Sequence, residues 1–232
     1  MRTWMACLIC VSAAGCTDLQ SSDLKTAGMS TYMTVTADGT GQTTVTAQFN
    51  VDNNGTDFVN LSSGDSAVAQ VASQSHTMSQ TNVLGDIAYQ TTFSGEDAAG
   101  TQYTVALQRS TDVSAPSSVC TLPSGFDITG PTSSGTFSRA NDLTVTYDNA
   151  GSSDTMTWSL SGCSEGTGSV TGDSGSFTIP KGTLSPGGEQ SGTCQDTITL
   201  TRARAGQVDP HYGSGGSITA QQVRSVTFNL TP

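Results

Sequence analysis

Apolar and polar residues alternate with a period of two along most of this chain. The first group of alternating runs lies before residue 112, at 45–51, 87–93 and 103–107. The second group lies after residue 118, at 143–147, 156–160, 177–179, 198–200 and 226–230. Successive side chains of a β-strand point to opposite faces, so the alternation predicts strands that each bury one face.

Turn-forming residues separate these runs. They include Asp38-Gly39, Asn53-Asn54-Gly55, Asn149-Ala150-Gly151 and Pro186-Gly187-Gly188. Short strands with regular turns are typical of Greek-key β-sandwiches rather than of alternating strands and helices. The pattern predicts an all-β fold, and it resembles the immunoglobulin-like sandwich in architecture.

A segment of low apolar content around Pro116 divides the two groups of runs. Such segments commonly mark the junction between domains. We therefore expect two immunoglobulin-like sandwiches in tandem, at 26–112 and 118–232, joined by a linker at 113–117. One larger sandwich is the alternative that the length of the chain allows.

The N-terminus has the pattern of an export signal. Arg2 precedes an apolar stretch at 4–14, which is too short to span a bilayer as a helix. The stretch ends in Ala13-Ala14-Gly15-Cys16, which resembles the lipobox of bacterial lipoproteins. That resemblance implies that residues 1–15 are a signal peptide that is removed and that Cys16 is acylated.

The segment after Cys16 is expected to be a flexible, lipidated tether at 16–28, because it carries few large apolar side chains. Thr17 stands where an Asp would resemble the inner-membrane retention signal, so the resemblance favours the outer membrane. Cleavage after Ala14, which would leave Cys16 as a free thiol, is the alternative. The sequence does not indicate whether the body faces the periplasm or the cell exterior.

Charge excludes some partners. The chain has 8 basic and 19 acidic residues and a net charge of −11. A surface of this sign repels nucleic acid and anionic lipid and favours solubility. The expected partners are therefore the bilayer that holds the lipid and, beyond it, an envelope protein or a glycan.

Three cysteines remain after the predicted signal peptide and Cys16 are set aside. They are Cys120, Cys163 and Cys194, and an odd number in an oxidising compartment leaves one unpaired. We favour a Cys163–Cys194 bridge because both lie beside strands of the second half, although Cys120 could replace either partner. Trp158 alternates with apolar neighbours, so we expect its ring in the core.

Three serine motifs match the letters around known nucleophiles: Gly64-Asp65-Ser66, Gly162-Cys163-Ser164-Glu165-Gly166 and Gly172-Asp173-Ser174-Gly175. A serine nucleophile needs a histidine base that a carboxylate orients. The chain offers only His76, without a nearby acid, and His211, for which Asp209 is expected to be poorly placed. We therefore interpret the motifs as turns and keep a serine-type hydrolase as an alternative.

The segment from Asp52 to Asp57 resembles a calcium-binding loop in its oxygen ligands. Asp52, Asn54 and Asp57 are its candidate ligands, but an Asn-Gly hairpin turn explains the segment without a metal. We predict no metal and no cofactor.

The long connection at 205–216 suggests a ligand site. Such a length is unusual in a hairpin. The basic and aromatic residues in or beside it are Arg202, Arg204, His211, Tyr212 and Arg224. They could form a patch that binds a carboxylated or phosphorylated glycan, but we favour the interpretation that the arginines pair with aspartates on a solvated face. The sequence thus predicts a non-enzymatic envelope lipoprotein with a binding or structural role, with the hydrolase and the glycan module as alternatives.

Overall fold

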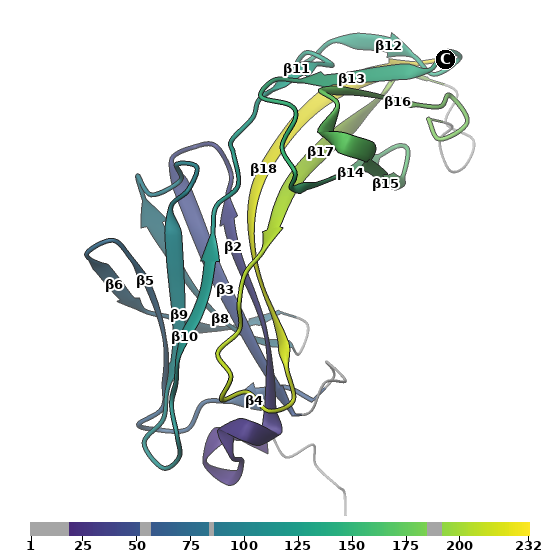
Figure 1. The fold of residues 1–232 in the computed structure, drawn as a ribbon. Coiled ribbons are helices and arrows are strands. Elements are labelled where there is room, and N and C mark those ends of the chain that lie inside the picture. The colour runs from purple at the N-terminus through teal and green to yellow at the C-terminus, as the bar shows by residue number, and fades with distance from the viewer. Residues whose placement is uncertain (1–18, 52–56, 84–85, 185–191) are drawn as a thin grey trace, which may run out of the picture.

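The computed structural model describes residues 19–51, 57–83, 86–184 and 192–232, and these form two β-sandwiches without an α-helix (Figure 1). The predicted all-β sandwich fold is confirmed. Two separate groups of buried apolar side chains form the cores, one in each sandwich.

The first sandwich has the strand order of an immunoglobulin-like domain. One sheet runs β7 (Ser79–Val83), β8 (Asp86–Ser94), β3 (Gln42–Val51), β2 (Met29–Ala37). The other runs β6 (Gln74–Thr77), β5 (Ser66–Val71), β9 (Gln102–Gln108), β10 (Ala115–Thr121). In chain order these are strands D-E-B-A and C′-C-F-G.

The second sandwich follows the same plan. One sheet runs β15 (Gly166–Val170), β14 (Thr155–Gly162), β17 (Cys194–Ala205), β18 (Gly216–Thr231), and β12 (Thr136–Ser138) pairs in parallel with the end of β18. The other runs β11 (Ile128–Gly130), β13 (Leu143–Tyr147), β16 (Ser176–Ile179). The predicted Cys163–Cys194 disulfide joins β17 to the residue after β14, and Cys120 is free and buried.

Short elements lie at the ends of the sandwiches. β1 (Leu19–Gln20) pairs in parallel with β4 (Val59–Asn60), and the 3-10 turns η1 (Ser21–Asp23) and η2 (Thr26–Gly28) lead into β2. A third 3-10 turn, η3 (Thr171–Asp173), follows β15. Residues 19–28 are therefore packed on the first sandwich, which differs from the expected flexible tether at 16–28.

The β17–β18 hairpin belongs to both sandwiches. Its twelve paired positions run from Cys194 with Leu230 to Ala205 with Thr219. Beyond the second sandwich, the first seven residues of β18 pair in parallel with β2. We call residues 203–222 the arm, and Figure 1 shows it extending down the first sandwich. Ile218 and Ala220 of the arm are buried in the first core.

The expected linker at 113–117 is not a separate connection in the structure. Ala115 begins β10, which pairs with β9, and Cys120 and Leu122 pack in the first core. Pro116 is tolerated because β10 lies at the edge of its sheet, where a missing N–H breaks no ladder. The first core thus takes residues from both sides of the expected boundary.

Trp158 lies at the open side of the second sandwich. Its ring is only partly buried and stacks on Phe177 with 5.8 Å between centroids. Gly168 is its partner on β15, and a Cβ there would lie 2.6 Å from the indole nitrogen. Because Gly168 has no side chain, the indole has room to lie against β15. The ring is only partly buried there, so the expectation of a core tryptophan holds only in part.

Candidate functional site

The three serine motifs do not bring a serine to a histidine. Ser66 donates to the Gln108 side chain, Ser164 to the Leu184 carbonyl, and Ser174 to the Ser176 carbonyl. Each hydroxyl therefore has a partner in the surrounding fold, and none of these bonds activates it as a nucleophile.

In two of these motifs the aspartate, rather than the serine, makes the main contact, which is a buried ion pair. Asp65 pairs with Arg109 at 2.8 Å, and Asp173 pairs with Arg202 at 3.0 Å, with all four side chains at most 1% exposed. A buried charge needs such a partner. The motif letters therefore mark two buried ion pairs.

The expectation that Asp209 is poorly placed for His211 was wrong. Asp209 Oδ1 accepts hydrogen bonds from the His211 backbone N–H at 2.9 Å and lies 2.7 Å from the ring Nδ1. The intervening Pro210 fixes a tight turn in which a side-chain oxygen meets the N–H two residues later. Such a turn is the reason that the short spacing brings the two groups together.

Asp209 also fastens the arm to β10. Its Oδ2 accepts hydrogen bonds from the backbone N–H and the hydroxyl of Ser117, each at 2.7 Å. Burial alone would raise the pKa of Asp209, but the bonds from His211 and Ser117 outweigh it and lower the pKa to about 2. Ser117 and His211 bind opposite oxygens of one carboxylate, so this cluster holds the loop in place.

The five residues suggested as a ligand patch do not share one exposed surface. Arg202 is fully buried, where it also donates to the carbonyls of Ser124 and Asn149, both at 2.9 Å. Tyr212 is 4% exposed and stacks on Phe49 in the first core. The His211 side chain is 49% exposed.

The other two arginines, like Arg202, pair with aspartates, as the favoured interpretation predicted. Arg204 forms two hydrogen bonds to Asp154, at 2.7 and 2.8 Å. Arg224 lies 3.4 Å from Asp127 and 5.6 Å from the Phe126 ring centroid. Arg202 lies on the buried face of β17. The period of two shows which residues share a face of a strand, but not whether that face is buried or solvated.

The suggested calcium ligands Asp52 and Asn54 lie outside the described residues. On either side of them, the Val51 N–H donates to the Asp57 carbonyl at 3.0 Å, and Asn50 forms an antiparallel bridge with Phe58. These contacts hold the two described ends of the segment side by side. Among the described residues, no helix has the length and apolar character needed to cross a membrane.

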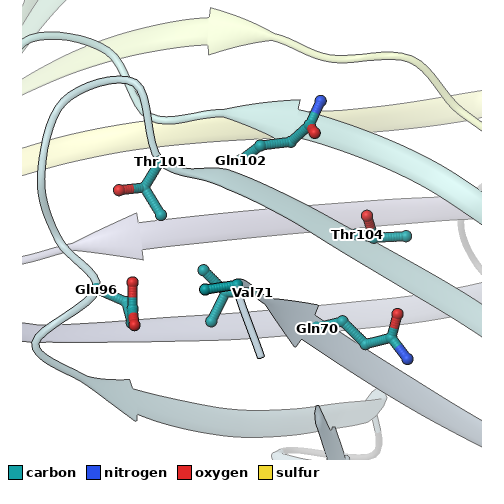
Figure 2. Close-up of a pocket in the computed structure, with 7 residues that line it drawn as sticks. Gln70, Val71, Glu96, Thr101, Gln102 and Thr104 are labelled. Atoms are coloured by element: carbon teal, nitrogen blue, oxygen red, sulfur yellow. The ribbon is translucent and has the colours of Figure 1, made fainter. Parts of the chain in front are cut away.

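One cleft lies at the end of the first sandwich between β5, β9 and the loop that joins β8 to β9. It has a volume of about 500 Å³. Its lining residues are Gln70, Val71, Ala72, Glu96, Thr101, Gln102 and Thr104. Figure 2 shows Glu96 and Thr101 at the loop end of the cleft, with Gln70 and Thr104 further along the two strands.

Buried hydrogen bonds hold the loop side of this cleft. The Tyr103 hydroxyl, within the core, donates to the Glu96 carbonyl at 2.6 Å, and burial raises the pKa of Tyr103 to about 12. Gln74 donates to the Glu96 carboxylate at 3.0 Å. The Glu96 side chain is therefore positioned, with acceptor capacity left over.

The cleft offers amides, hydroxyls and one carboxylate, with neither a cation nor an aromatic ring in its lining. Groups of this kind donate to and accept from the hydroxyls of a neutral ligand, and the carboxylate disfavours an acidic one. Sequence reasoning missed the cleft because it combines ordinary outward positions of two strands about thirty residues apart, Gln70 on β5 and Gln102 and Thr104 on β9, with residues of a turn and a loop. The positive φ of Ala72, 49°, marks its turn but leaves no sequence signal.

No family model and no curated protein matches this chain. Solved structures similar to it include fibronectin(III)-like modules of CbhA from Clostridium thermocellum, at 9% identity and a TM-score of 0.25, covering 86% of this chain and 90% of that one. The adhesin InvE of Yersinia pseudotuberculosis matches at 14% identity and a TM-score of 0.23, over 88% of this chain and 59% of that one. A bacterial ice-binding adhesin matches at 12% identity and a TM-score of 0.23, over 85% of this chain and 64% of that one. The chain thus spans less than two thirds of either adhesin chain.

Arg202→Ala should destabilise the second sandwich by about 3 to 5 kcal/mol, because it leaves the Asp173 carboxylate buried without its partner. Arg204→Ala is the matched control two residues along the same strand. Its side chain is 39% exposed, so we expect a loss below about 1 kcal/mol. Urea unfolding of both variants measures the difference, and equal losses would contradict a structural role for the buried pair.

The carboxylate of Asp209 should make the stability of the arm depend on acid. A folded pKa below the unfolded value means that the stabilisation is complete above about pH 4 and is lost as the pH falls through about 2. Asp209→Asn should therefore reduce the free energy of unfolding at pH 5 and have a smaller effect at pH 2. Asp86→Asn, at an exposed position of β8, is the control. A difference that stays constant with pH would overturn this assignment.

Proposed function

We propose that this chain is a non-enzymatic lipoprotein of the bacterial cell envelope whose two sandwiches form one elongated body that presents a binding surface. The β17–β18 hairpin carries this proposal, because it joins the sandwiches without a flexible linker. Figure 1 shows the turns before β2 at one end of the body and the C-terminus at the other. A body of this form suits a spacer that holds a surface away from its attachment point.

The lipobox-like Ala13-Ala14-Gly15-Cys16 supports attachment through an acylated Cys16, and Thr17 supports the outer membrane. Acyl chains hold a protein at a bilayer without a transmembrane helix. The non-enzymatic role is supported by the serine hydroxyls, which are bound within the fold, and by the Asp209 carboxylate, which fastens a loop.

Cys16→Ser should move the protein from the membrane pellet to the soluble fraction or leave the precursor uncleaved, because no acyl chain can be attached. Thr17→Ala keeps the cysteine and should partition as the original protein does. Thr17→Asp should shift the protein toward the inner membrane of a diderm host. Fractionation and immunoblotting measure all three, and unchanged partitioning of Cys16→Ser would rule out the anchor.

The cleft supports a binding role for the body. Besides the amides, hydroxyls and single carboxylate of its lining, it adjoins a sheet face whose outward side chains are uncharged: Ser66, Gln70, Gln102, Thr104 and Gln108. Hydroxyl-rich ligands bind through many hydrogen bonds to such groups. We propose a neutral glycan as the class of ligand for this cleft.

Gln102→Ala should weaken the binding of a neutral oligosaccharide about fivefold, because one lost hydrogen bond amounts to roughly 1 kcal/mol. The probes are maltohexaose, cellohexaose and mannohexaose, with polygalacturonate as the acidic comparison, and the measurement is titration calorimetry. Gln108→Ala, on the same face of β9 but outside the cleft, is the control. Equal weakening by both variants, or no binding of any neutral probe, would refute the glycan assignment.

A further inference from the structure

We infer that residues 19–28 are a rigid bracket, locked onto the first sandwich by Arg109, and that the bracket sets this end of the body against the bilayer. The inference rests on the proposed lipid attachment at Cys16. It adds an orientation and a second contact with the membrane, made by the protein itself.

Arg109 is the centre of the bracket. Its guanidinium is fully buried and donates to the carbonyls of Ser21 and Leu24, at 2.6 and 2.9 Å, and to the Thr26 hydroxyl at 3.0 Å. Its Nε pairs with Asp65 at 2.8 Å. One cation therefore ties three residues of the bracket to the end of β9.

Two further groups of contacts hold the bracket. The Asp65 carboxylate also accepts from the Ser21 hydroxyl at 2.7 Å. Asp112, in the loop that joins β9 to β10, accepts from the Thr26 N–H at 2.6 Å. The Thr26 hydroxyl donates to the Val113 carbonyl. At the other end of the bracket, β1 pairs with β4, so the segment is fixed along its whole length.

The remaining chain between the lipid and the bracket is short. Three residue steps separate Cys16 from Leu19, and a fully extended chain covers at most about 11 Å in three steps. The headgroup zone on each side of a bilayer is roughly 5 to 8 Å thick. The bracket end of the sandwich therefore lies at the headgroups.

This end also carries exposed apolar side chains. Among the described residues, Leu19 at 36% and Val113 at 56% are the large hydrophobic side chains most open to solvent. Leu19 is part of the bracket, and the Val113 carbonyl accepts a hydrogen bond from Thr26 of the bracket. Apolar side chains at this depth gain from contact with the acyl boundary. Because Asp23 and Asp112 outnumber Lys25 here, a zwitterionic headgroup surface is the partner that fits.

Hydrogen exchange of the soluble Cys16→Ser protein tests the bracket without any lipid. The amides of Ser22, Leu24, Thr26 and Gly28, whose N–H groups donate within the fold, should be protected in this protein and should exchange at least about tenfold faster when Arg109→Gln is added. Asp112→Ala is a milder variant that removes one acceptor and should release the turn at Thr26. Arg204→Gln, which breaks an exposed ion pair in the second sandwich, should leave the bracket protected. Exchange of these amides at the rate of an unfolded chain in the parent protein would overturn the inference.

The orientation is tested with the full lipidated chain in vesicles of phosphatidylcholine and phosphatidylethanolamine. A fluorophore on Val113→Cys should be quenched by a nitroxide on the lipid headgroups, whereas one on Ala140→Cys, beside the C-terminus, should not. Adding Arg109→Gln should reduce quenching at residue 113. Equal quenching at both positions would refute the orientation. Failure of acylation, detected by mass spectrometry of the Cys16 peptide, would instead refute the proposed anchor and leave the exchange result standing.

Discussion

The structure depends on the antiparallel ladder between β17 and β18. The part of the ladder near Cys194 and Leu230 completes the second sandwich. The part near Ala205 and Thr219 adds a parallel strand to β2 of the first sandwich. A ladder has little freedom to twist at one point, because each paired residue fixes its neighbours. At Gly206, where a Cβ would lie 2.2 Å from the Val119 carbonyl oxygen, the arm also meets the opposite sheet. The arm therefore contacts both sheets of the first sandwich, and the two sandwiches act as one body.

Buried arginines secure the parts of this body that the ladder does not reach. Arg109 donates hydrogen bonds to the carbonyls of Ser21 and Leu24 in the bracket. Arg202 donates to the carbonyls of Ser124 and Asn149, which lie in loops at the junction side of the second sandwich. A planar guanidinium suits this task because its donors point in fixed directions toward several acceptors. Each arginine pairs with a buried aspartate, Asp65 for Arg109 and Asp173 for Arg202, so neither charge is buried without a partner. Loops without regular secondary structure thereby obtain hydrogen-bond partners away from water.

The period of two predicted most strands, since alternation follows directly from burial of one face. The disulfide was predictable because Cys163 and Cys194 lie beside neighbouring strands. The pairing of the arm with β2 was not predictable, because a strand that continues into another sandwich keeps the same alternation along its whole length. Arg202 and Asp209 were misjudged for a related reason: burial of a charged residue depends on partners such as Asp173 and Ser117, which are distant in sequence. The cleft likewise has no local motif, since two strands and a loop create it.

The placement of the aspartates limits what this acidic protein can recognise. Asp65, Asp154, Asp173 and Asp209 accept hydrogen bonds within the fold. Meanwhile the outward faces of β2, β3 and β8 present uncharged pairs such as Thr34 with Thr46 and Thr44 with Thr92. An uncharged polar face attracts no ligand over long range, and its short hydrogen bonds compete with water. Under the proposed binding role, selectivity on this body would come from the shape and direction of fixed hydrogen-bonding groups, which the cleft beside Glu96 supplies and an open sheet face does not.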